Sequence, residues 1–465
     1  MSDDGVDRRA QVVDSALSRA AGGRPIPGNS VAPLIDGPDA YEAMYDLIRG
    51  AERWIHLENY IIRSDRVGWR FAELLMQRAR EGVRIRVLHD WLGSIGTSRR
   101  YWRALLEAGV EVRAFNRIRP FDVVPVLTRD HRKLIVADGR RAIIGGLCIG
   151  CEWTGETEPE CEPWRDTAVD IRGPAAAVLD QTFGITWGIS GGTVAEGESA
   201  TDIPPAGDAA VRVIAGEPGR ERVYRVIELL TAGALERLWI TDAYLVAPAR
   251  LFQALRDAAA DGVDVRLLVP GSSDIPLVRN VTRIGYRDLL RAGVRIFEWD
   301  GPMLHAKSVS MDQRWVRVGS SNINPASLIG NYELDVLVED PSLAEALENQ
   351  FRRDVSRSRE VSRRRVRGPA RISARLPSAL THIEPEQRVA YRYGRREIRR
   401  RAALALRTVA SGARRSLFGP MSAVLVLLAA LFLALPRVTG YVFGALCVWL
   451  ALGAAREAFR RRTDR

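Results

Sequence analysis

Lysine is nearly absent from this 465-residue chain. Lysine and arginine together number 68, yet Lys133 and Lys307 are the only two lysines. Every other basic side chain of this group is an arginine, whose planar guanidinium differs from an ammonium in size, hydration and reach. Because lysine is retained at two positions and replaced everywhere else, we expect those positions to require the ammonium group itself.

Cysteine is also scarce, and its four positions (Cys148, Cys151, Cys161 and Cys447) do not form a disulfide framework in a chain of this length. The first three lie close together in sequence, but no histidine lies among them and no second C-x-x-C pair follows. A zinc site is therefore the less favoured interpretation. The first 25 residues contain no apolar segment, so no N-terminal signal peptide is predicted.

Acidic residues are few at the C-terminal end. Residues 352–465 hold 26 arginines and seven acids, a net charge of +19. Since the whole chain carries +11, residues 1–351 carry −8. This asymmetry predicts a mildly acidic body and a basic tail that meets an anionic surface.

Helical and strand patterns alternate after residue 28. Helices are predicted at Tyr41–Arg49, Gly68–Glu81 and Arg99–Ala108, and strands at Trp54–Leu57, Val83–Leu88 and Val110–Phe115. This rhythm predicts an α/β fold with a mainly parallel sheet covered by helices on both faces.

The second half of the chain repeats the first. The matching segments are Glu52–Tyr60 with Glu236–Tyr244, Glu81–Arg86 with Asp261–Arg266, and Leu105–Val110 with Leu289–Val294. Two copies indicate a duplication rather than a solenoid. The seam is predicted in the Gly-, Ala-, Ser- and Pro-rich stretch from Ser190 to Ala210.

Each copy contains an H-x-K-x4-D motif. The first consists of His131, Lys133 and Asp138, and the second of His305, Lys307 and Asp312. In a strand, residues i and i+2 point to the same face, so each histidine is expected to project with its own lysine. The two aspartates have the opposite parity, and we interpret them as structural anchors of the motifs rather than proton carriers.

These residue types suit phosphoryl transfer. A neutral histidine can attack phosphorus or transfer a proton, and two facing histidines supply one nucleophile and one general acid. Two ammonium groups would neutralise charge on the phosphoryl oxygens. No metal and no other cofactor is then required. The alternative, a pair of core histidines in a repeated fold, does not explain why the only lysines occur in both motifs.

From roughly Gly28 to Glu339 the sequence resembles the phospholipase D superfamily, and within it the bacterial cardiolipin synthases. Besides the two motifs, the matching segments are Gly28-Asn29, Leu57–Tyr60, Trp164–Thr167, Gly319–Asn322 and Asn331–Glu333. The resemblance implies a duplicated phospholipase D-like fold, with two mainly parallel sheets flanked by helices and packed about a pseudo-dyad.

The resemblance also implies a role for each site residue. His131 would be the nucleophile and His305 the general acid and base. The phosphate-binding residues would be Lys133, Lys307 and Asn322, and the residues that orient the imidazoles would be Asp166 and Glu333. The chain departs from the family at Cys148, where relatives have asparagine, because a thiol is a poor hydrogen-bond donor to phosphate.

Two apolar stretches near the C-terminus, Ser416–Leu435 and Val438–Ala455, predict a transmembrane hairpin. Arginines crowd its outer ends, so the positive-inside rule places the catalytic body in the cytoplasm, at a bacterial inner membrane. A buried helical hairpin of a soluble domain is the alternative. The predicted organisation is a flexible arm (1–28), two phospholipase D-like halves (29–190 and 211–351), an arginine-rich juxtamembrane linker (352–415), the hairpin (416–455) and a basic cytoplasmic tail (456–465).

The leading functional hypothesis is a cardiolipin synthase-like phosphatidyltransferase. Its expected partners are phospholipids, namely phosphatidylglycerol with phosphatidylethanolamine as a further candidate, and an anionic membrane surface. A phospholipase D that hydrolyses the same lipids to phosphatidic acid is the main alternative. A nuclease of the superfamily is less favoured, because the acidic body is unsuited to nucleic acid and no nucleic-acid partner is expected. An inactive scaffold is also less favoured, because both motifs are complete.

Overall fold

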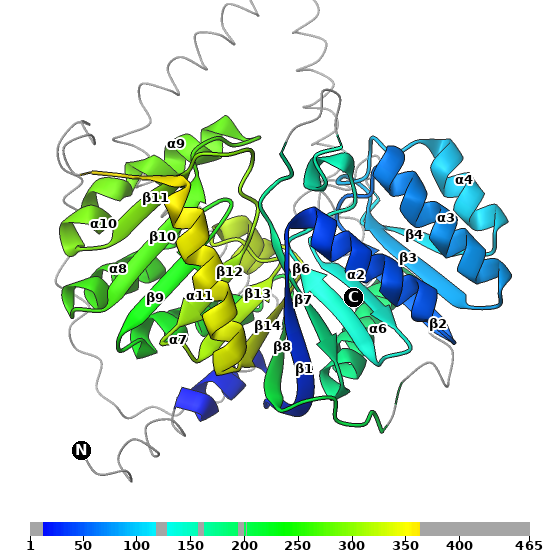
Figure 1. Cartoon of the computed structure of the whole chain (residues 1–465), viewed down its shortest axis with the longest axis horizontal. Helices are drawn as coiled ribbons and strands as arrows, with labels where there is room; N and C mark the ends of the chain where they lie inside the picture. The colour runs from blue at the N-terminus through cyan, green and yellow to red at the C-terminus, as the bar shows by residue number, and fades with distance from the viewer. Residues whose placement is uncertain (1–12, 118–127, 157–161, 194–199, 201, 363–465) are drawn as a thin grey trace, which may run out of the picture. The chain divides into compact units, whose positions relative to one another are not determined.

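One mixed β-sheet of 15 strands runs through the protein (Figure 1). The structure is a computed structural model that describes residues 13–117, 128–156, 162–193, 200 and 202–362. All of these residues belong to one compact unit. The strand order is β15-β11-β10-β9-β12-β13-β14-β8-β1-β7-β6-β5-β2-β3-β4.

The first half runs from β1 to α6. Its strands are β1 (Ile26–Ile35), β2 (Trp54–Asn59), β3 (Arg84–Asp90), β4 (Glu111–Phe115), β5 (Lys133–Ala137), β6 (Arg141–Gly145) and β7 (Thr167–Arg172). Its helices are α2 (Asp36–Gly50), α3 (Arg66–Arg80), α4 (Arg99–Glu107) and α6 (Pro174–Ile189), with a short 3-10 turn at Cys151–Trp153. The elements predicted between Tyr41 and Phe115 all occur, in the predicted order.

The second half repeats this arrangement. Its strands are β8 (Ala209–Gly216), β9 (Arg237–Thr241), β10 (Asp264–Pro270), β11 (Arg295–Trp299), β12 (Ser308–Met311), β13 (Trp315–Gly319) and β14 (Glu333–Glu339), followed at the edge by β15 (Ser358–Glu360). Its helices are α7 (Arg222–Gly233), α8 (Ala249–Ala260), α9 (Pro276–Ile284), α10 (Tyr286–Ala292) and α11 (Pro341–Ser356), with a π-helical turn at Ala326–Gly330. The order β4-β3-β2-β5-β6-β7-β1 mirrors β11-β10-β9-β12-β13-β14-β8, and the halves join where β1 pairs with β8.

The prediction of two mainly parallel sheets is wrong, because the halves share one mixed sheet. Among the described strands, the parallel neighbours are β2, β3 and β4 in one half and β9, β10 and β11 in the other. The motif strands instead form antiparallel hairpins, β5 with β6 and β12 with β13. A tight turn can join only antiparallel strands, since a parallel pair requires a crossover of a dozen residues or more.

The motif aspartates anchor these hairpins. Asp138 begins the turn after β5 with φ of 55°, and its carboxylate accepts backbone N–H groups of Glu52, Arg53 and Trp54 at 2.8 Å each. Asp312 has φ of 51° and accepts those of residues 235–237 at 2.9 Å. Each aspartate therefore ties its hairpin to the start of the neighbouring strand, as the opposite parity predicted.

These anchors correct one detail of the repeat. The backbone N–H of Trp54 donates to Asp138, and the equivalent N–H in the second half, which donates to Asp312, is that of Arg237. In the same register, Ile55 pairs with Ala137 and Leu238 pairs with Met311. The structural equivalence of β2 and β9 is therefore shifted by one residue from the match of Glu52–Tyr60 with Glu236–Tyr244. The wrong alignment arose because Tyr60 and Tyr244 are the same residue type but lie one backbone position apart.

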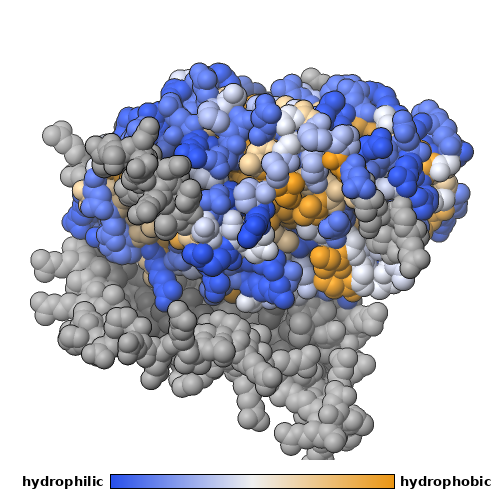
Figure 2. Space-filling model, turned by 90° about the horizontal axis from the view of Figure 1, so that it is seen from below, coloured by the Kyte–Doolittle hydropathy of each residue, from blue (hydrophilic) through white to orange (hydrophobic). Residues whose placement is uncertain are grey.

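Apolar helix faces cover the sheet. In Figure 1, α2 lies in front of the strands of the first half and α11 in front of those of the second. Helices α6 and α11 share one central cluster with strands from both halves, which contains Phe183, Trp187, Val336 and Leu347. From below, the surface of the described part is mainly hydrophilic with small apolar patches (Figure 2). Most apolar side chains therefore pack between helices and strands or between the two halves.

The flexible arm predicted for residues 1–28 is wrong for its described part. Residues 13–21 are helical, and β1 begins at Ile26. Leu17 is fully buried and packs with Ala20 and Ala21 in the core of the second half. These residues lie at i, i+3 and i+4, which is the spacing of an apolar helix face that the polar composition concealed.

The predicted linker also begins as ordered structure, because residues 352–362 complete α11 and form β15. The remainder of the linker, the hairpin at 416–455, the tail at 456–465, Cys161 and Cys447 lie outside the described residues. None of the helices within the described ranges combines the length and apolar character that crossing a bilayer demands.

Candidate active site

The short segment that contains each motif histidine is hydrogen-bonded to the backbone of the opposite half. The backbone N–H of His131 donates to the carbonyl of Tyr332 at 2.9 Å, and that of His305 donates to the carbonyl of Arg165 at 2.7 Å. Isolated bridges join Asp130 to Tyr332 and Arg165 to Leu304. Each histidine therefore lies just before its motif strand, held by backbone of the opposite half.

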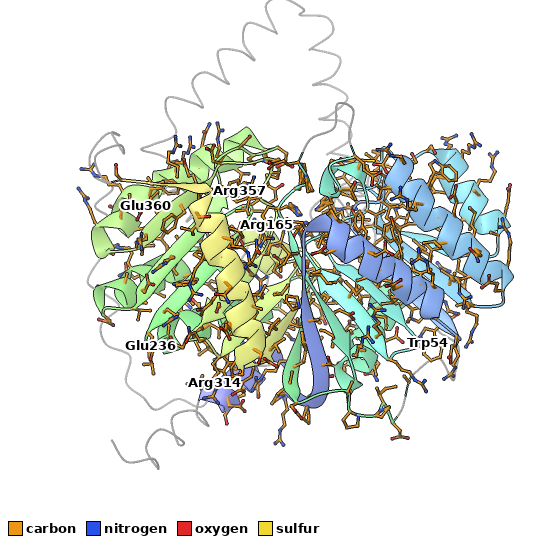
Figure 3. The ribbon with its side chains drawn as sticks, viewed as in Figure 1. Trp54, Arg165, Glu236, Arg314, Arg357 and Glu360 are labelled. Atoms are coloured by element: carbon orange, nitrogen blue, oxygen red, sulfur yellow. The ribbon has the colours of Figure 1, made fainter. Side chains whose placement is uncertain are left out.

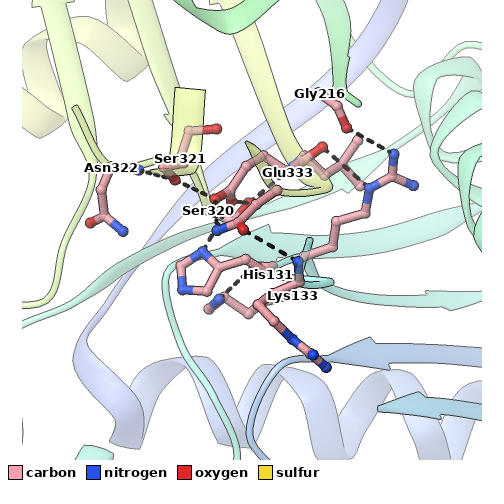
Figure 4. A network of polar contacts seen from close by, with 12 residues as sticks. His131, Lys133, Gly216, Ser320, Ser321, Asn322 and Glu333 are labelled. Atoms are coloured by element: carbon pink, nitrogen blue, oxygen red, sulfur yellow. Dashed lines mark hydrogen bonds and ion pairs between the residues drawn. The ribbon is translucent and has the colours of Figure 1, made fainter. Parts of the chain in front are cut away.

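The side chains cross the seam in the same way. Nδ1 of His131 lies 3.0 Å from Oε2 of Glu333 (Figure 4), and Nδ1 of His305 lies 2.8 Å from Oδ2 of Asp166. Because a carboxylate only accepts hydrogen bonds, each pair places a proton on Nδ1 and leaves Nε2 free for chemistry. The two carboxylates that were expected to orient the imidazoles are thus in contact with them, each with the histidine of the other half.

Both carboxylates are themselves held in place. Glu333 accepts hydroxyl hydrogen bonds from Ser320 and Ser327. Asp166 accepts the indole N–H of Trp153 and the backbone N–H of Thr167, at 2.9 and 2.8 Å. These partners fix the carboxylate oxygens, and through them the orientation of each ring.

The lysines lie beside the histidines, as the i, i+2 spacing predicted. Each ammonium donates to the backbone carbonyl of its own motif histidine, Lys133 to His131 and Lys307 to His305. Nζ of Lys133 lies 5.3 Å from the ring centroid of Tyr60, and Nζ of Lys307 lies 6.0 Å from that of Tyr244.

The same tyrosines also pack against the imidazoles. The ring of Tyr60 lies 4.9 Å from that of His131, and the ring of Tyr244 lies 6.0 Å from that of His305. These tyrosines had no assigned role in the sequence, although their repetition after β2 and β9 was a usable signal.

Burial and neighbouring ammonium groups keep the histidines neutral. Burial, followed by the charge of Lys307, lowers the pKa of His305 from 6.5 to about 4. Burial likewise lowers the pKa of His131, while the carboxylate of Glu333 acts in the opposite direction. Lys133 also acts on His305, and Lys307 on His131, so the two motifs share one electrostatic environment.

Asp166, Glu333 and Lys307 remain charged at neutral pH although they are buried. Burial alone would raise the pKa of Asp166, but His305 and Lys307 hold it at about 2. The pKa of Glu333 is also lowered, because His131 and Lys133 outweigh its burial. Burial lowers the pKa of Lys307 to about 8, which leaves it charged at neutral pH.

Two buried arginines join the halves around the site. Arg132, next to His131, donates to the backbone carbonyls of Glu333 and Gly216 (Figure 4). Arg165, which lies between the halves in Figure 3, forms an ion pair with Asp354 of α11 at 2.9 Å. Removing one partner from such a buried pair typically costs about 3–5 kcal/mol. Neither role was apparent in a sequence with so many arginines.

The loop after each hairpin completes the site. Asn322 follows β13 and is buried, and Cys148 occupies the equivalent place after β6. Burial raises the pKa of the Cys148 thiol, although the charges of Lys133 and Lys307 act on it in the opposite direction. The structure therefore brings Cys148 to the same site as both lysines.

The low pKa of His305 predicts a specific acid sensitivity. Because this pKa is lower in the folded protein than in the unfolded chain, the stabilisation from neutral His305 is complete above about pH 6.5 and is lost as the pH falls towards 4. His305→Gln removes this titration. The melting temperature should therefore fall less steeply between pH 8 and pH 5 for His305→Gln than for the wild-type protein. Parallel melting curves would contradict the buried neutral histidine.

Comparison with known proteins places this chain in a family. The family model described as "Cardiolipin synthase, PLD-like domain" matches residues 44–152 and 226–355. The chain is 32% identical over 378 residues to "Cardiolipin synthase A" of Pseudomonas aeruginosa (strain LESB58), covering 79% of this chain and 76% of that protein. It is 32% identical over 360 residues to "Cardiolipin synthase" of Halalkalibacterium halodurans, covering 76% and 71%.

A solved structure has the same fold. The crystal structure of phosphatidylserine synthase from Haemophilus influenzae Rd KW20 superposes with a TM-score of 0.59 at 16% identity, covering 75% of this chain and 92% of that one. The chain belongs to the cardiolipin synthase family of phospholipase D-like proteins.

Proposed function

We propose that this chain is a phosphatidyltransferase that makes cardiolipin from phosphatidylglycerol through a phosphatidyl-histidine intermediate. The observation that carries the proposal is the pair of crossed histidine–carboxylate contacts, with one ammonium group beside each imidazole. The names of its curated relatives support the choice of reaction.

In the first step, Nε2 of His131 attacks the phosphorus of the donor lipid. The new P–N bond forms as the P–O bond to the head-group alcohol breaks, and His305 donates a proton to the leaving oxygen. His131 is the better candidate for the nucleophile, because its side chain is 12% exposed and that of His305 is 7% exposed.

In the second step, a hydroxyl group of phosphatidylglycerol attacks the phosphorus. His305 takes the hydroxyl proton, the P–N bond breaks and His131 is released. The donor is phosphatidylglycerol, which releases glycerol, or phosphatidylethanolamine, which releases ethanolamine. Attack by water instead would give phosphatidic acid, the product expected of a phospholipase D.

Substrate binding enables His305 to take up from solvent the proton that the acid requires. Lys133 and Lys307 offset the negative charges of Asp166 and Glu333, and both imidazoles are uncharged in the free site. A phosphodiester brings one negative charge, which raises the pKa of a nearby imidazole. His305 thus becomes a proton donor when the substrate is bound, while Lys133, Lys307 and Asn322 contact the phosphoryl oxygens.

We also propose that residues outside the described ranges hold the enzyme at a bacterial inner membrane with its body in the cytoplasm. The apolar pair of segments at 416–455 and the arginines on both sides of it support this assignment. Each arginine close to an anionic surface contributes roughly 1 kcal/mol of attraction.

A lipid-product assay tests the reaction. Purified protein given phosphatidylglycerol should yield a four-chain lipid and free glycerol, detected by mass spectrometry. His131→Ala and His305→Ala should each reduce turnover by at least about 10³-fold, because each removes a group that forms or breaks a bond. His382→Ala, a histidine outside both motifs, is the matched control. Phosphatidic acid as the sole product would identify a hydrolase, and full activity in either motif variant would refute the two-histidine mechanism.

A truncation tests the membrane assignment. Deletion of residues 416–465 should release the protein from sedimented membranes, because it removes the apolar segments and the last arginines together. Fractionation followed by immunoblotting provides the measurement. A truncated protein that sediments with membranes as before would show that another part of the chain is the anchor.

A further inference from the structure

The two halves of the site differ at two equivalent positions. After the motif hairpins, Cys148 stands where the second half has Asn322. In the neighbouring strand, Asn59 of β2 pairs with Lys133, and the shifted register makes Asp242 its counterpart, next to Lys307. Each half therefore has one asparagine at the phosphate end of its lysine strand, but the two asparagines lie in different segments.

Asn59 lies between the lysine and the hairpin loop. Its Cα is directly opposite that of Lys133 in the antiparallel β2–β5 pair, and side chains of such a pair project from the same face. Its Nδ2 makes a long contact of 3.4 Å with the carbonyl of Leu147, the residue before Cys148. The carboxamide is therefore located beside both groups that frame the phosphate site of the first half.

The carboxamide oxygen of Asn59 lacks a hydrogen bond. Asn59 is 2% exposed, and its Oδ1 has no hydrogen-bond partner among the described residues. Oδ1 of Asn322 is in the same state. Buried amide groups are nearly always paired, so an unpaired one requires an explanation. Both asparagines show this deficit, one in each half, which indicates that each has a partner only when the site is occupied.

The second half has no need for a carboxamide in this strand. There, Asp242 accepts the backbone N–H groups of Tyr244 and Ile323, at 2.9 and 2.8 Å, and so holds the loop that presents Asn322. In the first half, a neutral Asn59 replaces this carboxylate, and the loop residue Cys148 is a weak donor. Of the two equivalent positions in the first half, Asn59 and Cys148, only Asn59 therefore carries a carboxamide.

We propose that Asn59 supplies the phosphate contact that Cys148 cannot make, so that its Nδ2 donates to a phosphoryl oxygen while its Oδ1 accepts from Lys133. Asn59 is thus the counterpart of Asn322 in function but not in position. The ligand is a tetrahedral oxyanion, which the proposed function identifies as the phosphodiester of a phospholipid. This inference rests on that function for the identity of the substrate and not for the binding of the oxyanion.

Binding of tungstate, an unreactive tetrahedral oxyanion, to the purified full chain tests the inference by calorimetry. Asn59→Ala should weaken binding about 10- to 100-fold, as expected for the loss of a hydrogen bond to a charged group. Asn322→Ala should cause a similar loss. Adding Cys148→Asn to Asn59→Ala should restore most of the affinity, because it returns a carboxamide to the loop.

Asn59→Asp is a nearly isosteric second variant for the case in which Asn59→Ala fails to fold. It should weaken tungstate binding more than alanine does, because it removes the donor and adds a negative charge. Unchanged tungstate affinity in the folded Asn59 variants would overturn the proposal, and so would a loss that Cys148→Asn does not reverse.

Lipid turnover by the same proteins separates this inference from the proposed function. If the tungstate affinities of the wild-type protein and its variants follow the predicted order, but the wild-type protein forms no cardiolipin, then the proposed reaction fails and the role of Asn59 stands.

Discussion

The contact of each motif imidazole with a carboxylate of the opposite half is the constraint on which the rest of the structure depends. His131 belongs to the first half and is oriented by Glu333 of the second, while His305 is oriented by Asp166 of the first. Neither half contains a complete histidine–carboxylate pair. The shared sheet, the crossing backbone segments and the buried arginines all hold the two halves in the register that these contacts require.

The crossed pairs also explain how so many ionisable groups are buried together. A buried charge is costly unless an opposite charge and hydrogen bonds compensate for it. Here, two ammonium groups face two carboxylates, each carboxylate has further donors, and the imidazoles stay neutral. In the proposed reaction, a bound phosphodiester adds one negative charge to this site. That charge raises the pKa of His305, so that the imidazole becomes the acid that the first step needs.

Much of this arrangement could be predicted from the sequence, because its signals are local. The i, i+2 spacing placed each lysine beside its histidine, and the parity of Asp138 and Asp312 identified them as anchors. Other features depend on contacts between distant segments. The antiparallel motif hairpins and the single mixed sheet follow from turn geometry and from the β1–β8 junction, which a helix–strand rhythm does not contain. The roles of Arg132 and Arg165 were hidden among 66 other basic residues.

The central claim is that two unequal histidines act on one phosphorus atom. The most direct test mixes the wild-type protein with phosphatidylglycerol, stops the reaction within milliseconds in alkali, which preserves phosphohistidine, and locates covalent adducts by tandem mass spectrometry. The account predicts at most one phosphatidyl group per chain, carried by His131 and absent from His305. Adducts on both histidines of one chain, or an adduct on Cys148 or a lysine, would contradict it.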